Sequence, residues 1–287
     1  MKKLIIFLAI FLVMLNLSFA QNKLNVIVIG AHPDDCDIDA GGTAILFSKA
    51  GHNVMFVSVT NGDAGHHEKG GGALAKIRRA EAQEAGKRFG VKYVVLDHHD
   101  GELLPTLDIR LEIIRLIRQW NADIVIGPRP NDYHPDHRNT AILLQDAAYM
   151  VIVPNVAPDT PPLKRNPVFL YTEDGFQKPT PFQPDIAVDI TSVFDQKVYA
   201  MSAHESQFFE WLPWTSGTLD EVPKTEAERL KWLAEWRKSK INEKTKASLI
   251  KRYGNEKASA VKIAETFEIC EYGKRPSDEE ITRLFPF

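Results

Sequence analysis

This chain of 287 residues lacks several features that mark common classes of protein. It has two cysteines, Cys36 and Cys270, too few for a fold that depends on disulfides, although the two could form one disulfide or stay as free thiols. The formal net charge is −3 and no tract of Lys or Arg is present, which argues against nucleic acid as a partner. Internal repeats and low-complexity segments are also missing, so repeat architectures are excluded.

Long apolar runs are absent except near the N-terminus. Lys2 and Lys3 precede an apolar run from Leu4 to Leu15, and Ser18-Phe19-Ala20 places small residues where a signal peptidase cuts. The run is short for a membrane span. Residues 1–20 are therefore predicted to be a secretory signal peptide cleaved near Ala20, and we expect an exported protein, periplasmic or secreted.

Short apolar segments alternate with amphipathic ones between residues 24 and 150. The predicted strands are rich in Val and Ile: Asn25–Ile29, Val54–Val59, Tyr93–Leu96 and Ile124–Ile126, with Val168–Tyr171 and Ile186–Val188 further on. The predicted helices lie near Gly41–Lys49, Leu74–Phe89 and Leu107–Gln119. This alternation predicts an α/β fold, a Rossmann-like and mostly parallel sheet with helices on both faces. The first strand is not followed by Gly-x-Gly-x-x-Gly, which sets aside dinucleotide binding.

The rest of the chain predicts an addition to this core. A Pro-rich stretch from Pro154 to Pro167 indicates a surface loop, and the highly charged region 220–252 has the pattern of an exposed amphipathic helix. We expect an α/β core over residues 21–210. We expect residues 211–287 to form a charged helical appendage and C-terminal segment packed on the same domain.

Two polar clusters follow predicted strands. The first is His32-Pro33-Asp34-Asp35, and the second is His134-Pro135-Asp136-His137. Ligands of open α/β sheets bind at the carboxyl ends of the strands, where both clusters would lie. Two His and one Asp can hold zinc with one position left for water, and iron, cobalt or manganese would also fit such a site. A second Asp and a second His remain for acid–base chemistry and charge stabilisation.

With neighbouring motifs, these clusters resemble a known family. The motifs are Ala31-His32-Pro33-Asp34-Asp35 with Gly41-Gly42, Thr60-Asn61-Gly62-Asp63, Arg78-Arg79-Ala80-Glu81, Asp100-Gly101 and His134-Pro135-Asp136-His137-Arg138. In order and spacing they resemble the PIG-L/LmbE-type zinc-dependent N-acetylglucosaminyl deacetylases over residues 24–150. Two later segments, Val188-Asp189-Ile190 and His204-Glu205-Ser206-Gln207, are also similar.

The resemblance implies a role for each matching position. His32, Asp35 and His137 would be the zinc ligands, and Asp34 would be the general base. His134 would stabilise the oxyanion, and Arg78 and Asp100 would contact sugar hydroxyls. It implies a metal-dependent N-deacetylase that removes the acetyl group from a substrate containing N-acetylglucosamine, and together with the predicted signal peptide an exported one. An amidase acting on a larger acyl-amino-sugar conjugate and a non-catalytic glycan-binding protein remain as alternatives.

Four other features have two interpretations each. Cys36 follows the first cluster where many members of that family have Glu, and it is either a weak extra metal ligand or a thiol sensitive to oxidation. Asp136 either keeps His134 protonated or is a solvated loop acid. The glycine-rich loop with His66 and His67 is either a lip over the substrate or a plain surface loop. The aromatic group Phe208, Phe209, Trp211 and Trp214 either stacks on sugars or, as we favour, anchors the charged helical region.

Overall fold

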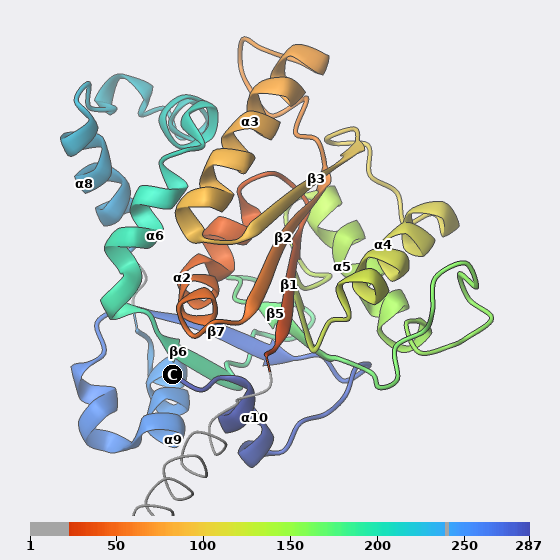
Figure 1. Ribbon diagram of the computed structural model, residues 1–287. Helices are drawn as coiled ribbons and strands as arrows, with labels where there is room; N and C mark the ends of the chain where they lie inside the picture. The colour runs from red at the N-terminus through yellow and green to blue at the C-terminus, as the bar shows by residue number, and fades with distance from the viewer. Residues whose placement is uncertain (1–22, 239–240) are drawn as a thin grey trace, which may run out of the picture.

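The computed structural model describes residues 23–238 and 241–287, so the predicted signal peptide lies outside the described part. Seven strands form one mixed sheet in the order β3-β2-β1-β4-β5-β7-β6 (Figure 1). Their bounds are β1 Asn25–Gly30, β2 Asn53–Thr60, β3 Lys92–His98, β4 Ile124–Gly127, β5 Val168–Thr172, β6 Ile186–Asp189 and β7 Ala264–Ile269. The first five strands pair in parallel, whereas β7 pairs antiparallel with both β5 and β6.

Helices cover both faces of the sheet, as Figure 1 shows. One face carries α2 Asp35–Lys49, α3 Gly71–Phe89 and α6 Phe194–Met201, and the other carries α4 Leu107–Trp120 and α5 Pro135–Met150. In β1, Val26 and Val28 pack on the α2 side, whereas Ile27 and Ile29 pack on the α4 side. Because both faces are covered, the central strands are apolar throughout. The predicted fold class is confirmed.

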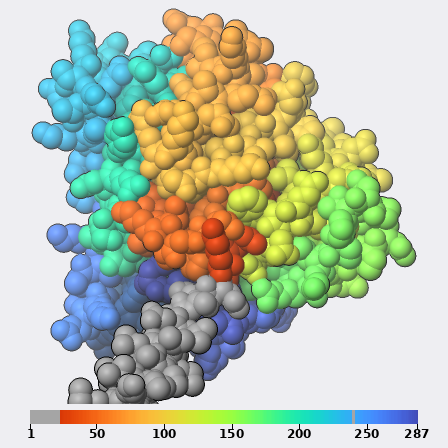
Figure 2. All heavy atoms as spheres, in the orientation of Figure 1, coloured from red at the N-terminus to blue at the C-terminus, as the bar shows by residue number. Residues whose placement is uncertain are grey.

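The remaining elements surround the β5–β7–β6 part of the molecule and the α2 side. They are η1 Thr191–Val193, η2 Ser206–Trp211 (a π-helical turn), α7 Leu212–Thr215, η3 Leu219–Glu221, α8 Glu226–Arg237, α9 Glu243–Ala260 and α10 Asp278–Leu284. In the space-filling view, the blue C-terminal segments lie directly against the rest of the molecule (Figure 2). No helix within the described ranges has both the length and the apolar character needed to cross a bilayer.

The C-terminal segment is not only helical, because it also supplies β7 inside the sheet. This strand is not among those predicted from the sequence. Its Glu265 is buried, and the carboxylate accepts hydrogen bonds from the main-chain N–H groups of Gly42 and Thr43 and from Lys197 Nζ. Because the charge of Glu265 is neutralised only in the folded chain, the sequence around it has the pattern of an exposed segment.

The strand order places the two polar clusters together. The chain leaves β1 toward β2 on one side, while β4 pairs with β1 on the other side. The loops after β1 and β4 therefore border the point where the strand order reverses, which is where open α/β sheets form their binding crevice. His32 lies in the first loop and His134 at the end of the second.

Candidate functional site

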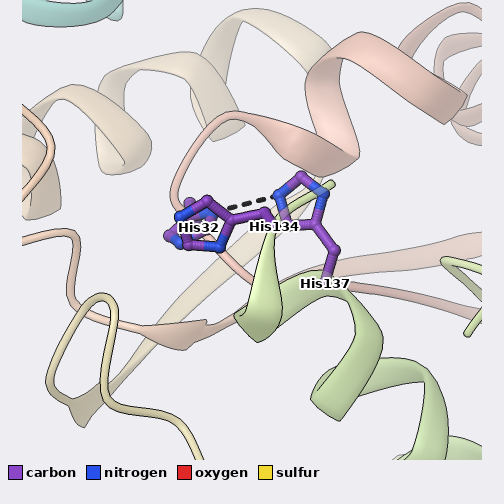
Figure 3. A group of neighbouring side chains, drawn as sticks. All are labelled: His32, His134 and His137. Carbon is purple, nitrogen blue, oxygen red and sulfur yellow. Dashed lines mark hydrogen bonds between the residues drawn. The ribbon is translucent and has the colours of Figure 1, made fainter. Parts of the chain in front are cut away.

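Three imidazole rings converge at this edge of the sheet (Figure 3). His32 follows β1, His134 caps the N-terminus of α5, and His137 lies in the first turn of that helix. His32 Nδ1 is 3.1 Å from His137 Nε2, the contact drawn as a dashed line. The three rings each offer a nitrogen within 4.8 Å of the others, so they could hold a metal ion.

The three predicted metal ligands also come together. Asp35 Oδ2 is 3.6 Å from His32 Nδ1 and 3.5 Å from His137 Nε2. Three donors at this spacing suit a tetrahedral ion about 2 Å from each of them. The same Asp35 oxygen accepts the main-chain N–H groups of Ala31 and His32, both at 2.8 Å, which fixes its position at the start of α2.

Carboxylates hold the outer nitrogen of both histidines. His32 Nε2 is 3.0 Å from Asp100 Oδ1, and His137 Nδ1 is 3.1 Å from Asp132 Oδ1. A carboxylate beside the outer nitrogen is typical of metal-binding histidines, because it orients the ring and leaves the inner nitrogen for the ion. Asp132 is not among the residues predicted from the sequence, although its position two residues before His134 in the same loop was a usable signal.

Asp136 has neither of the two roles considered for it. It is fully buried, so it is not a solvated loop acid, and it accepts the main-chain N–H groups of Gly101 and Leu103. Its carboxylate lies 3.4 Å from His32 Nε2. Burial and the nearby His32 and His137 lower the pKa of His134 despite the attraction of Asp136. His134 Nδ1 accepts the N–H of Asp136 at 3.2 Å, so neutral His134 carries its proton on Nε2.

The charges of the cluster are strongly coupled. Burial lowers the pKa of His137, but Asp35 and Asp132 outweigh this effect and raise it to about 9. Burial raises the pKa of Asp35, but His137 and His32 outweigh it and hold that pKa well below its ordinary value. His32 Nδ1 and His137 Nε2 face each other at 3.1 Å, so one of them carries a proton that a metal ion has to displace.

Asp34 is buried beside this cluster, in an unusual backbone conformation (φ 155°, ψ −21°) for a residue other than glycine. Its Oδ1 accepts a hydrogen bond of 2.9 Å from Arg78 Nη2, which also donates to the carbonyl of Pro33. Burial raises the pKa of Asp34 to about 6, although Arg78 acts in the opposite direction. A carboxyl group with a pKa near neutrality suits a general base.

His32, Asp34 and Asp35 line a cavity with a volume of about 650 Å³. The two predicted sugar-contact residues, Arg78 and Asp100, lie in the wall of this cavity. Both are buried and both have protein partners: Arg78 binds Asp34, and Asp100 binds His32. Arg78 Nη1 is also 3.9 Å from Asp100 Oδ2. Contact of these residues with sugar hydroxyls remains a prediction.

The two cysteines are buried and free, which settles the alternative of a disulfide. Cys36 Sγ lies 3.4 Å from the carbonyl of Val28 and 3.5 Å from that of Val57. Its thiol is thus engaged with the main chain of the sheet and does not belong to the groups of the described residues that could hold a metal.

The aromatic group of η2 and α7 divides into two parts. Phe208 and Phe209 are buried and contact Trp236 and Trp232 of α8, so they anchor that helix as predicted. Trp211 instead lines the cavity.

The glycine-rich loop is tied to this region, because His66 is buried with Nε2 2.7 Å from Glu210 Oε2.

Comparisons with known proteins agree with this geometry. Residues 27–148 match the family model PIG-L, described as GlcNAc-PI de-N-acetylase. The chain is 34% identical over 203 residues to diacetylchitobiose deacetylase of Thermococcus kodakarensis. The aligned region covers 66% of this chain and 73% of that protein. The chain belongs to the PIG-L family.

Two further relatives of this PIG-L family member bear on its fold and chemistry. The N,N'-diacetylchitobiose deacetylase from Pyrococcus horikoshii superposes with a TM-score of 0.65 and 26% identity, covering 86% of this chain and 84% of that chain. A 4-oxalmesaconate hydratase from Pseudomonas putida is 26% identical over 204 residues, covering 68% of this chain and 78% of that protein. Relatives thus include both deacetylases and a hydratase.

Proposed function

We propose that this chain is a metal-dependent hydrolase that removes the acetyl group from an N-acetylglucosamine unit. The observation that carries the proposal is the placement of Asp34. Its carboxyl group, with a pKa of about 6, lies next to the three converging donors of His32, Asp35 and His137. A base and a metal site on one cavity wall are what amide hydrolysis requires.

The donor set fits a divalent ion, and we propose zinc. Two imidazoles and one carboxylate form the site, and carboxylates support both histidines from outside. When bound, zinc would lower the pKa of a water toward about 7 and polarise the acetyl carbonyl.

The chain's own residues supply the proton transfers. Asp34 accepts a proton from the attacking water and then passes it to the sugar nitrogen as the C–N bond breaks, giving acetate and an amine. Arg78 keeps the Asp34 carboxylate in place through its hydrogen bond to Oδ1. Neutral His134 donates from Nε2 to the oxygen that gains negative charge, so it does not need the protonated form expected from the sequence.

Hydration of an unsaturated organic acid is the competing reaction, since one relative is a hydratase. Such a substrate needs cationic groups for its carboxylates. Of the three arginines that line the cavity, Arg78 binds Asp34 and Arg129 binds Asp174 at 2.6 Å, so only Arg237 is left to meet substrate carboxylates. The wall also includes Asp39 and Glu173. An uncharged sugar is therefore the better fit.

The test is release of acetate and free amine from N-acetylglucosamine and N,N'-diacetylchitobiose by the purified protein. We expect activity that a chelator abolishes and zinc restores, and a loss of about 10²–10⁴-fold in Asp34→Asn with zinc still bound. Equal activity of Asp34→Asn and the unchanged protein would contradict the mechanism. Release from bulkier N-acyl sugars alone would favour the amidase alternative, and sugar binding without release would favour the binding protein.

We further propose that the protein is exported, on the basis of the leader-like residues 1–20. Mass spectrometry of the N-terminus of protein recovered outside the cytoplasm tests this. A mature chain that begins at Gln21 is expected, and an intact Met1 in a cytoplasmic fraction would contradict it.

A further inference from the structure

The cavity has an aromatic wall, which we define as Trp211 and Trp236. These residues come from η2 and α8, beyond the part of the chain that matches the family model. Trp211 and Trp236 line the same cavity as His32, Asp34 and Asp35. Trp236 packs on Phe208 and so also helps to anchor α8, whereas Trp211 takes no part in these contacts and its place at the cavity is not explained by them.

A stack of four nearly parallel rings holds Trp211 in place. Trp211 stacks on Trp214 (centroids 5.3 Å apart, 14° between planes), and Trp214 stacks on His67 (5.2 Å, 8°). His67 stacks on His66 (4.5 Å, 14°), whose Nε2 is held by Glu210. Stacking fixes the orientation of the indole before any ligand arrives, which reduces the entropy lost on binding.

Trp211 lies beside the predicted sugar contacts. A Cβ atom added at Gly65 would be 3.8 Å from Trp211 Nε1, 3.0 Å from Arg78 Nη1 and 3.2 Å from Asp100 Oδ2, so these three groups surround one point. In the part of the chain that the structure describes, Trp211 Nε1 has no hydrogen-bond acceptor. A sugar hydroxyl would supply one.

Trp236 extends the wall in the last turn of α8. It is 39% exposed and is backed by Trp232 at 5.2 Å. The guanidinium of Arg237 packs on its ring at 5.7 Å and lines the cavity, and no carboxylate among the described residues forms an ion pair with it. The wall thus combines flat apolar rings with free N–H donors.

We propose that Trp211 and Trp236 bind sugar units adjoining the one that loses its acetyl group, so that the substrate class is an oligosaccharide of N-acetylglucosamine. Each pyranose has an apolar C–H face that covers an indole ring, while its hydroxyls accept hydrogen bonds from Trp211 Nε1 and Arg237. The volume of about 650 Å³ lies mid-range for pockets that enclose drug-sized ligands, and a single sugar would leave much of the wall uncovered.

The proposal rests on the proposed function, and kinetics with sugars of increasing length test it. In the zinc-loaded protein, kcat/KM should rise from N-acetylglucosamine to N,N'-diacetylchitobiose to N,N',N''-triacetylchitotriose. Trp211→Ala and Trp236→Ala should each reduce the trimer-to-monomer ratio of kcat/KM by about tenfold, mainly through KM. Trp211→Phe, which keeps a flat ring, should recover most of the ratio. Tyr149→Ala removes an exposed aromatic outside the cavity and serves as the control.

An unchanged ratio in both alanine variants, with thermal unfolding like that of the unchanged protein, would overturn the proposal. A binding measurement separates it from the proposed function. Calorimetric titration of zinc-loaded Asp34→Asn with triacetylchitotriose does not depend on turnover. We expect Trp211→Ala and Trp236→Ala, each added to Asp34→Asn, to weaken this binding at least tenfold. That result would support sugar binding by the aromatic wall even if no acetate is ever released. Absent or equally tight binding would refute it.

Discussion

At the level of single residues, the ionisation of Asp34 depends on Arg78. Burial raises the pKa of Asp34 to about 6, and the Arg78 guanidinium opposes that rise. Asp34 accepts a proton only when it is ionised, so kcat/KM should fall as the pH drops through about 6. Arg78→Gln removes the opposing charge and should shift this acid limb to higher pH, as well as lowering activity. Arg79→Gln, at a half-exposed neighbour paired with Asp97, is the matched control and should leave the limb in place. An acid limb at the same pH in Arg78→Gln would show that Asp34 is not the titrating base.

Three of the residues predicted from the sequence carry two signals at once. His32, Asp35 and His137 have metal-binding side chains and belong to polar clusters that follow apolar strands. The fold brings their donors within 3.6 Å of one another, and their binding of a metal stays a prediction. Asp132 carries only one signal, a carboxylate in a loop, and its role becomes visible through its 3.1 Å contact with His137. The tautomer of His134 could not be predicted either, because it depends on a main-chain N–H of the folded helix.

At the level of elements, a buried ion pair joins β7 to α2 and α6. Lys197 Nζ of α6 is 2.7 Å from Glu265 Oε1 of β7, and the same carboxylate binds two N–H groups of α2. Lys197→Met leaves this buried carboxylate without its cation and should lower the free energy of unfolding by about 3–5 kcal/mol. Urea unfolding measures the change. Lys251→Met, which breaks an exposed pair with Asp278, should cost no more than about 1 kcal/mol. Equal effects of the two substitutions would mean that the buried pair does not hold β7 in the sheet.

The same contacts explain which elements were predictable. The strands β1 to β6 are short apolar runs, and the periodicity that identifies them is local. The strand β7 contains Glu265, Thr266 and Glu268 among three apolar residues, and the burial of Glu265 depends on a lysine 68 residues away along the chain. The Pro-rich loop was correctly placed, but the sequence did not show that Arg118 would order it by donating to main-chain carbonyls such as those of Val151 and Ala157.

At the level of the whole molecule, the candidate metal site joins two distant parts of the chain. His32 and His137 are separated by 105 positions, so only the folded chain brings their nitrogens together. A metal ion that binds the folded chain alone raises its stability according to its concentration and affinity. Protons compete for the same nitrogens, so stability, metal binding and pH are coupled.

The pH dependence of stability has opposite signs in the metal-free and the zinc-loaded protein. Without metal, the pKa of His137 rises from 6.5 to about 9, so its favourable interaction with Asp35 and Asp132 is complete below pH 6.5 and is lost as the pH rises through about 9. Zinc binding behaves in the opposite way, because deprotonation frees the nitrogen for the ion. The difference in melting temperature between zinc-loaded and metal-free protein should therefore widen from pH 6.5 to pH 9. His137→Gln should abolish the difference at every pH, while His98→Gln, at a histidine paired with Glu112 outside the cluster, should preserve it. A difference that is constant across this range would mean that zinc does not displace a proton from His137.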